Sequence, residues 1–268
     1  MDQMREKAIR AIVDTAIKSF AEGFELRHES ELNDVNGTIN MKKNNCFIAA
    51  LGEEFIFYSA FVRSFDSSFG HLLEDLGNTI AKFSYETNKT IHSFMLPEQT
   101  QHISNILDKY EDHVCKPLIS HYESFYQLMP ADITSFQTKH ECDNWFYDKE
   151  NKIHYLVELK AGGDLDNKKA KSEKLALLKE YFMLKNIASS DEKIVIKFAT
   201  AYNKFGEGKE WHQSNVETFF SRDELLIGNE YWNFVCNDKN GFNIIFDQYK
   251  ISSVYIKDSI TRIKKMYS

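Results

Sequence analysis

The segment from residue 138 to residue 202 restricts the possible folds of this chain most, because its hydrophobic pattern combines three strands with one helix. The stretch HECDNWFYDKENKIHYLVELK predicts two strands around the polar turn DKEN. The next stretch, NKKAKSEKLALLKEYFMLKNI, predicts a helix with Leu175, Leu178 and Phe182 on one face, and KIVIKFATAY predicts a buried strand. Strand, strand, helix and strand in this order imply a hairpin that leads into a right-handed parallel crossover, and therefore an α/β fold.

The chain before this segment shows helical periodicity. Apolar residues recur at helical spacing from Ile9 to Phe20, and Gly23 follows as the expected end of that helix. The polar stretch 33–45 contains an Asn-Gly turn and predicts a loop. The run CFIAALGEEFIFYSAFVRSF is apolar nearly all round, which predicts a buried helix.

Three further helical regions are expected. The stretch DSSFGHLLEDLGNTIAKF predicts a separate helix with Ser67 or Ser68 as its N-cap, and another helix is expected over 98–126. The C-terminal third is also helical in pattern, with Ser221 and Glu224 as a capping box. No linker divides the chain, so we expect one domain over 1–268. It would comprise a mainly helical region over 1–137, an α/β core over 138–205 and a mainly helical region over 206–268.

Charge and cysteine content narrow the possible functions. The net charge of −7 disfavours a non-specific nucleic-acid binder, but it allows a protein that holds DNA in a local cleft. The cysteines Cys46, Cys115, Cys142 and Cys236 form no CxxC pair, which favours reduced thiols over disulfides or a structural zinc site. No apolar run approaches the roughly 18–20 residues of a membrane span, and the first residues do not resemble a signal peptide, so we expect a cytoplasmic protein.

The second predicted strand ends in charges that a buried strand does not easily accommodate. Glu158 and Lys160 share one face, because side chains alternate along a strand. If Tyr147 pairs with His154, Asp143 lies opposite Glu158, with Cβ atoms about 4.5–5.5 Å apart. Two carboxylates at that distance repel unless a cation lies between them, and Mg²⁺ prefers such oxygen ligands. Lys160 would then supply a positive charge for a phosphate group or an attacking water.

The spacing of an acid two residues before a lysine is not specific by itself. It also occurs at Glu150–Lys152, Asp166–Lys168, Asp191–Lys193 and Glu207–Lys209. Glu158 and Lys160 differ in context, because they end an apolar strand, follow an acid on the preceding strand and precede a pair of glycines. The alternative interpretation is a surface ion pair on an edge hairpin, and the residues alone leave both open.

Asp143, followed by Glu158-Leu159-Lys160, a helix and a buried strand, resembles the core of the PD-(D/E)XK nucleases. Within that superfamily the chain resembles type II restriction endonucleases of the TdeIII kind. The resemblance is carried by SSFGHLLEDLGNTIAK, ECDNWFYDKENKIHYLVELKAGGDLDNKKAKSEK and ATAYNKFGEGKEW. Cys142 stands where the motif has proline. The resemblance implies a restriction-endonuclease-like mixed β-sheet core flanked by helices, with helical N-terminal and C-terminal additions.

The resemblance also implies an activity. A homodimer would hydrolyse both strands of double-stranded DNA with Mg²⁺, at a short palindromic site related to GGNCC, and leave 5′-phosphate ends. A cognate DNA methyltransferase would belong to the same system. Asp143 and Glu158 would hold the metal with the carbonyl of Leu159, and Lys160 would orient or help deprotonate the water. Glu74 is a candidate further acid, with Asp75 as the neighbouring alternative and a solvated helix acid as the plain interpretation.

Two polar regions are candidates for DNA contact. Lysines crowd the start of the helix after Lys160, where they either contact phosphates or form a solvated face; they are Lys168, Lys169, Lys171 and Lys174. Gly162 and Gly163 either let DNA approach the backbone or simply end the strand. The loop 202–215 carries residue types that can bind base edges, namely Asn203, Lys204, Lys209, His212, Gln213 and Asn215. The three tryptophans are expected in the core, and His140 and His154 in packing or surface roles.

Two other functions stay open on the sequence. One is a different nuclease on the same core, such as a repair or resolvase-like enzyme. The other is a helical DNA- or protein-binding module in which the hairpin ion pair is incidental. The acidic net charge suits the binding module, and the charges at the strand end suit a nuclease.

Overall fold

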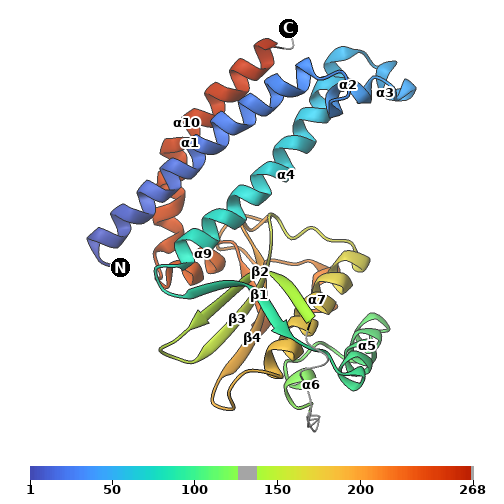
Figure 1. Cartoon of the computed structure of the whole chain (residues 1–268), viewed down its shortest axis with the longest axis vertical. Helices are drawn as coiled ribbons and strands as arrows, with labels where there is room; N and C mark the ends of the chain where they lie inside the picture. The colour runs from blue at the N-terminus through green and yellow to red at the C-terminus, as the bar shows by residue number, and fades with distance from the viewer. Residues whose placement is uncertain (126–137, 267–268) are drawn as a thin grey trace. The chain divides into compact units, whose positions relative to one another are not determined.

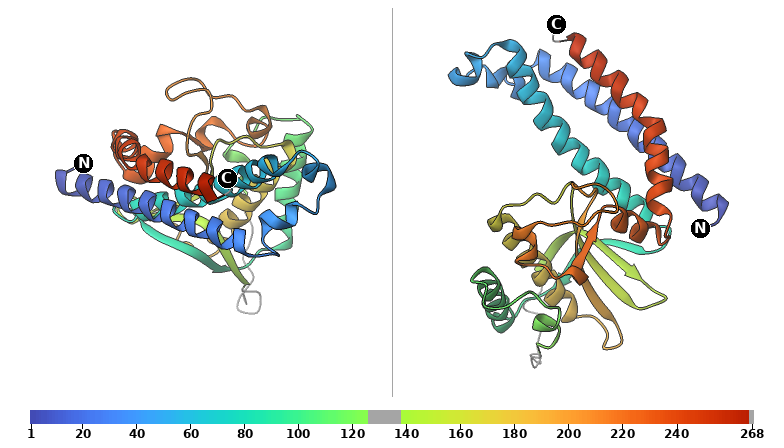
Figure 2. Two further views of the ribbon diagram at one scale, coloured as in Figure 1. Left: turned by 90° about the horizontal axis from the view of Figure 1, so that it is seen from above. Right: turned by 180° about the vertical axis from the view of Figure 1, so that it is seen from behind.

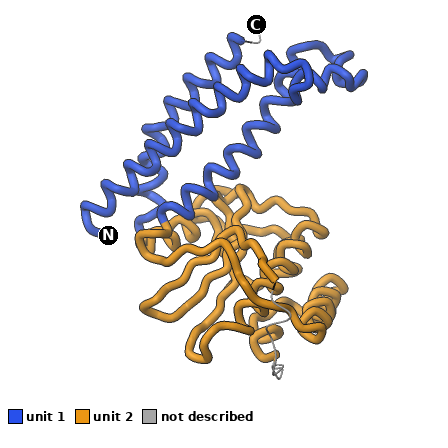
Figure 3. The backbone as a smooth tube through the Cα atoms, in the orientation of Figure 1, with its two compact units in different colours: residues 1–80, 240–268 blue, residues 81–239 orange. Residues whose placement is uncertain are grey.

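A computed structural model describes residues 1–125 and 138–266 of the chain. It divides into two compact units, one of residues 1–80 with 240–268 and one of residues 81–239 (Figure 3). The single nuclease domain expected over 1–268 stays a prediction, namely that the two units work together in one nuclease. Residue 126, the last residue of the helix expected over 98–126, lies outside the described residues. No helix among the described residues is long and apolar enough to cross a membrane.

Unit 1 is helical. Its long helices are α1 (Gln3–Asn33), α4 (Glu53–Ala81, whose last residue belongs to unit 2) and α10 (Gly241–Met266). Two short helices, α2 (Thr38–Lys42) and α3 (Cys46–Ala49), lie between α1 and α4 in sequence. Figures 1 and 2 show α1 and α10 side by side. Phe24 of α1, Phe57 of α4 and Ile263 of α10 share one buried cluster, which joins the three helices.

Several predictions for unit 1 are wrong in detail. The first helix runs through Gly23 to Asn33, because Phe24 and further residues continue its buried face. The loop expected over 33–45 contains α2. No new helix begins at Ser67 or Ser68, because α4 runs unbroken through both serines. The helix expected to be buried nearly all round carries exposed side chains at Phe55, Tyr58 and Val62.

Unit 2 is built on a mixed five-stranded sheet in the order β1-β2-β3-β4-β5. The strands are β1 (Glu86–Ser93), β2 (Thr138–Asp148), β3 (Ile153–Lys160), β4 (Lys193–Thr200) and β5 (Leu225–Ile227). β1, β2 and β3 are antiparallel, whereas β4 and β5 run parallel to β3. The predicted hairpin and parallel crossover are confirmed, and so is the α/β fold class with its helical additions.

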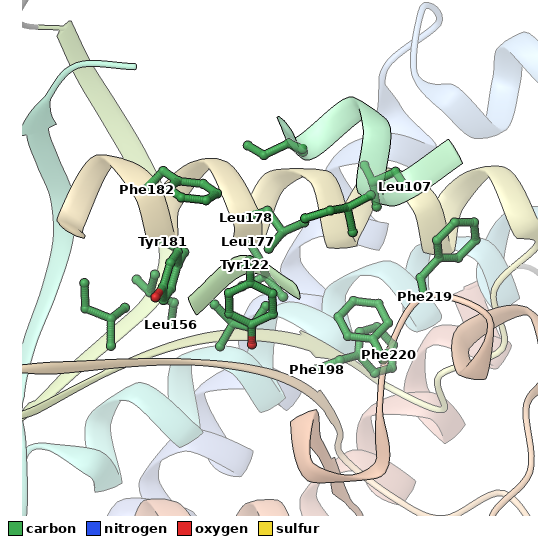
Figure 4. Packing of buried hydrophobic residues seen from close by; sticks show 14 of the residues in the cluster. Leu107, Tyr122, Leu156, Leu177, Leu178, Tyr181, Phe182, Phe198, Phe219 and Phe220 are labelled. Atoms are coloured by element: carbon green, nitrogen blue, oxygen red, sulfur yellow. The ribbon is translucent and has the colours of Figure 1, made fainter. Parts of the chain in front are cut away.

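The helices of unit 2 cover both faces of this sheet. They are α5 (Pro97–Glu111), α6 (Ser120–Glu123), α7 (Asn167–Lys185), α8 (Ser214–Glu217), α9 (Asn229–Cys236) and the 3₁₀ turn Arg222–Glu224. Leu178 and Phe182 of α7 belong to the same buried cluster as Leu156 of β3 and Phe198 of β4 (Figure 4). On the other face, Phe234 of α9 packs against Phe146 and Tyr155 of the sheet, with its ring tilted to the first and edge-on to the second. This packing fixes α7 over the end of β3.

Lys174 corrects one prediction. It was expected among the exposed lysines, but its side chain is fully buried and ion-paired with Glu224. The predicted capping box is confirmed, since Glu224 accepts hydrogen bonds from the backbone and hydroxyl of Ser221. Tyr122 also donates to Glu224, over 2.9 Å. Glu224 therefore joins α6, α7 and the turn before β5. Of the three tryptophans expected in the core, Trp211 and Trp232 are buried and Trp145 is half-buried.

Candidate active site

The hairpin has the predicted register up to the point where chemistry is expected. Tyr147 pairs with His154, and the ladder between β2 and β3 ends with Trp145 opposite Leu156. Beyond that pair, the link between the two strands is made by a side chain. The side-chain amide nitrogen of Asn144 donates to the carbonyl oxygen of Val157 over 3.1 Å. Asp143 is therefore not a ladder partner of Glu158, which corrects the expected pairing.

A bulge in β2 explains where Asp143 lies. Between the pairs Asn88–Trp145 and Thr90–Glu141, two steps along β1 match four steps along β2. The extra residues interrupt the alternation of side chains in the stretch that contains Asp143. Asp143 is exposed, yet its negative charge raises the pKa of the buried Glu158 carboxyl. The two acids are thus close enough to interact, without facing each other across the ladder.

Glu158 and Lys160 form an ion pair at the carboxyl end of β3. Nζ of Lys160 lies 2.5 Å from a carboxylate oxygen of Glu158, and the Glu158 side chain is only 9 % exposed. Burial raises the pKa of Glu158 to about 7, against the opposing effect of Lys160. For Lys160, burial works against the charge, but Glu158 and Glu173 outweigh it and raise its pKa. Lys160 is therefore held as an ammonium group.

Helix α7 brings two further acids to the Glu158–Lys160 pair, and neither was predicted from the sequence. Glu173 lies 3.1 Å from Nζ of Lys160. Glu180, two turns later, has a pKa raised to about 8 by burial and by the charges of Glu158 and Asp143. Glu173 and Glu180 are seven residues apart, a spacing that puts both on one face of a helix and that can be recognised in the sequence. Which face of α7 meets the strand, however, depends on tertiary packing.

The donor set fits a hard divalent cation. Burial raises the pKa of Glu158 and of Glu180, and the negative charge of Asp143 raises both further. The site is therefore rich in negative charge that Lys160 alone does not neutralise. Carboxylate oxygens and a backbone carbonyl are the ligands that Mg²⁺ prefers. Asp143 on β2 and Glu158 on β3 offer carboxylate oxygens, and Leu159 on β3 offers a backbone carbonyl. The residues present therefore suit the expected metal.

The remaining predicted acid belongs to unit 1. Glu74 is on α4, in unit 1, with a carboxylate oxygen 3.9 Å from Nδ1 of His71. Its role as a further acid of the site stays a prediction. Asp75, the alternative, lines an open apolar groove of unit 1 between α1 and α4.

The lysines of α7 that were predicted to contact DNA differ in exposure and in their ion-pair partners. Lys168 and Lys169 are exposed, and Lys169 lies 3.8 Å from the N-cap residue Asp166. Lys171 is already engaged, with Nζ 2.6 Å from Glu111 and 3.0 Å from Asp108 of α5. Lys168 and Lys169 are thus the members of this group best placed to meet a phosphate.

The loop 202–215 uses several of its polar groups to hold its own shape. The buried side chain of Asn203 donates to the carbonyl of Lys209 over 2.7 Å. Gln213 is also buried and donates to Asp164 over 2.9 Å, while Lys204 lies 3.1 Å from the same carboxylate. This pattern favours a structural role for Asn203 and Gln213.

Other loop residues are open to a ligand. Lys209 is exposed, and His212 is exposed between Glu210 and Glu217. Both residues, with Asn203 and Trp211, line a cavity of about 650 Å³. Lys209 and His212 are therefore the loop residues best placed for DNA contact.

Unit 1 contains a basic pocket that sequence analysis also missed. A cavity of about 240 Å³ is lined by three cations, Arg27, Lys42 and Arg63, and by one carboxylate, Glu31. Hydroxyl groups of Thr38, Ser64, Ser67 and Ser68 also line it. Cations and hydroxyls are the groups that contact DNA phosphates. The cations come from α1, α2 and α4, so their spacing along the chain gave no signal.

Comparison with known proteins adds one finding. Residues 5–253 match the family model described as the type II restriction endonuclease HinfI. The match includes Asp143, Glu158, Lys160 and all five strands. No curated protein and no solved structure matches.

Proposed function

Because the chain belongs to the HinfI family of type II restriction endonucleases, we propose that it cleaves double-stranded DNA at a specific site with Mg²⁺, using Asp143, Glu158 and Lys160. Family membership makes it a hydrolase of a restriction system that acts on DNA. The expectation of a nuclease hydrolase of a restriction system is thereby confirmed, while site-specific cleavage and the TdeIII-like details stay predictions. The observation that carries the assignment of residues is the ion pair between buried Glu158 and half-buried Lys160, with the charge of Asp143 acting on Glu158.

The metal site of the proposal consists of Asp143, Glu158 and the carbonyl of Leu159. When bound there, Mg²⁺ would lower the pKa of a water and neutralise charge on the scissile phosphate. Glu158 must be ionised to take part, and its raised pKa means that it is about half protonated near neutral pH in the metal-free protein. Burial is the main cause of that raised pKa, and the charge of Asp143 adds to it.

Lys160 supports the reaction through its positive charge. Its raised pKa keeps it protonated, which favours orienting the attacking water over removing a proton from it. As the water oxygen bonds to phosphorus and gives up a proton to the solvent, the bond to the 3′ oxygen breaks, the departing oxygen takes up a proton, and negative charge grows on the phosphoryl oxygens. A fixed ammonium group stabilises that charge. The products carry a 5′-phosphate and a 3′-hydroxyl. Glu173 holds Lys160 from the side of α7.

DNA binding is proposed to involve the exposed groups of both units. The candidates are Lys168, Lys169, Lys209 and His212 of unit 2 and the basic pocket of unit 1. The acidic net charge of the chain does not argue against DNA binding by these local cations, because phosphate contact needs positive charge only where the DNA lies. We further propose a homodimer, since two active sites cut both strands at a palindrome. The enzyme would work in the cytoplasm beside a cognate methyltransferase.

A digestion experiment tests the proposal. Purified protein is incubated with plasmid DNA and Mg²⁺, and the ends of the fragments are sequenced. Discrete fragments with 5′-phosphate ends support a site-specific enzyme, and the shared end sequence tests the predicted relation to GGNCC. A smear would favour a less selective nuclease on the same core. Intact plasmid under all divalent cations would contradict the assignment.

A further inference from the structure

His140, Cys142 and Glu180 form a compact group beside the candidate active site. Their possible ligand atoms, a ring nitrogen, a thiol sulfur and a carboxylate oxygen, all lie within 4.8 Å of one another. Nε2 of His140 is 3.2 Å from Oε1 of Glu180. Neither the cysteine spacing nor the histidine spacing predicts such a group, because its members come from a strand and a helix 40 residues apart at His140 and Glu180.

The fold explains why these side chains meet. His140 and Cys142 are two residues apart on β2, and their possible ligand atoms lie within 4.8 Å of each other. Helix α7 packs over the sheet and brings Glu180 to both of them. Cys142 is 4 % exposed and Glu180 is 8 % exposed, whereas His140 is half-buried. The group is thus largely shielded, with His140 at its entrance.

We propose that His140, Cys142 and Glu180 bind a divalent transition-metal ion of the zinc type, at a site separate from the Mg²⁺ site of Asp143 and Glu158. Zinc takes nitrogen, sulfur and oxygen ligands at about 2.0–2.3 Å, commonly three from the protein with water as the fourth. Tetrahedral bonds of that length leave ligand atoms about 3.3–3.8 Å apart. Ligand atoms as far apart as 4.8 Å would need to approach one another by about 1.0–1.5 Å. Mg²⁺ does not favour a thiolate, so the ligand set itself separates the two sites.

Such an ion would also act on the active site. The charge of Glu180 interacts with those of Glu158 and Asp143. A divalent cation on Glu180 would add positive charge beside these acids and so weaken their hold on Mg²⁺. We expect low concentrations of Zn²⁺ to reduce Mg²⁺-dependent cleavage several-fold. This effect on cleavage rests on the proposed function, whereas metal binding at the site does not.

Cobalt is the probe for the experiment, because a thiolate ligand gives Co²⁺ a charge-transfer absorption band. Chelator-treated, full-length protein is titrated with Co²⁺. One ion per chain should bind with this band, and Zn²⁺ but not excess Mg²⁺ should displace it. Cys142→Ser should lose the band, while the exposed-cysteine control Cys46→Ser should keep it. His140→Ala and Glu180→Gln should lower the affinity by more than about 100-fold, since even outer partners of a metal contribute about 10–100-fold.

Several outcomes would overturn the proposal. They are no thiolate band in the folded wild-type protein, a band that survives in Cys142→Ser, or unchanged cobalt affinity in both His140→Ala and Glu180→Gln. If Cys142→Ser does not fold, the cobalt affinities of His140→Ala and Glu180→Gln test the proposal in its place. Asp143→Asn separates this proposal from the proposed function, because it should abolish cleavage and keep the cobalt band. Zinc inhibition that persists in Cys142→Ser would place the inhibitory ion elsewhere.

Discussion

The ammonium group of Lys160 lies 2.5 Å from the carboxylate of Glu158, two residues earlier on the same strand. Each group is partly removed from water, and each depends on the other for its charge. An exposed pair of this type contributes little to stability. A largely buried pair at the end of a strand is more informative, because it keeps a cation and an anion ready where a substrate can enter.

Loss of Lys160 should stop the chemistry and spare binding. We expect Lys160→Ala to lower the cleavage rate by about 10²–10³-fold, since it removes a charge that stabilises the transition state. DNA affinity in Ca²⁺ should change little. Lys152→Ala is the matched control, because Lys152 is an exposed, acid-paired lysine just before the other end of β3. Single-turnover cleavage and gel-shift assays measure the two effects. Normal cleavage by Lys160→Ala would refute its assigned role.

The rate of cleavage should rise with pH through neutrality. The pKa of Glu158 is raised to about 7, so below that pH its carboxyl is protonated and cannot bind a metal. At low Mg²⁺ the rate should fall about tenfold per pH unit below about 6 and level off above about 8. Higher Mg²⁺ should move the midpoint to lower pH, because metal and proton compete. A flat profile between about pH 5.5 and 8 at low Mg²⁺ would contradict this.

The buried pair of Lys174 and Glu224 should be costly to break from one side. Lys174→Met leaves the buried carboxylate of Glu224 without its cation. We expect the free energy of unfolding to fall by about 3–5 kcal/mol. Lys168→Met, an exposed position on the same helix, should change it by less than about 0.5 kcal/mol. Urea unfolding followed by circular dichroism measures both. Equal stability of the two variants would show that Lys174 is not needed for its charge.

Two glycines should respond to alanine with opposite signs. Gly163 has a φ of +68°, and an added Cβ would lie 2.6 Å from Cγ2 of Thr200. We expect Gly163→Ala to destabilise the protein by about 1–3 kcal/mol. Gly70, inside α4, has open space around the position of a Cβ, so Gly70→Ala should stabilise it by about 0.5–1 kcal/mol. Thermal unfolding of both variants tests the pair, and two shifts of the same sign would be inconsistent with this argument.

The basic pocket of unit 1 should contribute to DNA binding without reading its sequence. Arg63→Ala should weaken binding of all DNA sequences alike and reduce the slope of log K against log salt by about 0.9. Arg262→Ala is the control, because Glu25 already neutralises that arginine at 2.7 Å. Fluorescence anisotropy at several salt concentrations gives both slopes. If the two variants behave alike, the pocket does not hold a phosphate.

The hairpin and the place of Glu158 and Lys160 were predictable because they depend on local alternation along a strand. The bulge that displaces Asp143 was not, since it arises where β2 is paired with β1. β1 itself was missed because its sequence, ETNKTIHS, is largely polar, as suits an edge strand. Glu173 and Glu180 were missed for a different reason. Their approach to the site depends on how α7 lies on the sheet.

The pairing of α1 with α10 has a consequence for how the protein forms on the ribosome. Ser259 of α10 donates to the carbonyl of Ala21 of α1, across 238 residues of sequence. At about 5–20 residues per second, synthesis of that interval takes roughly 10–50 s. During this time the apolar side chains of Ile9, Val13 and Ile17 lack their C-terminal partner, while the whole sheet is already translated. The helical unit is therefore the last to assemble. Until it does, the nascent chain exposes the apolar face of α1.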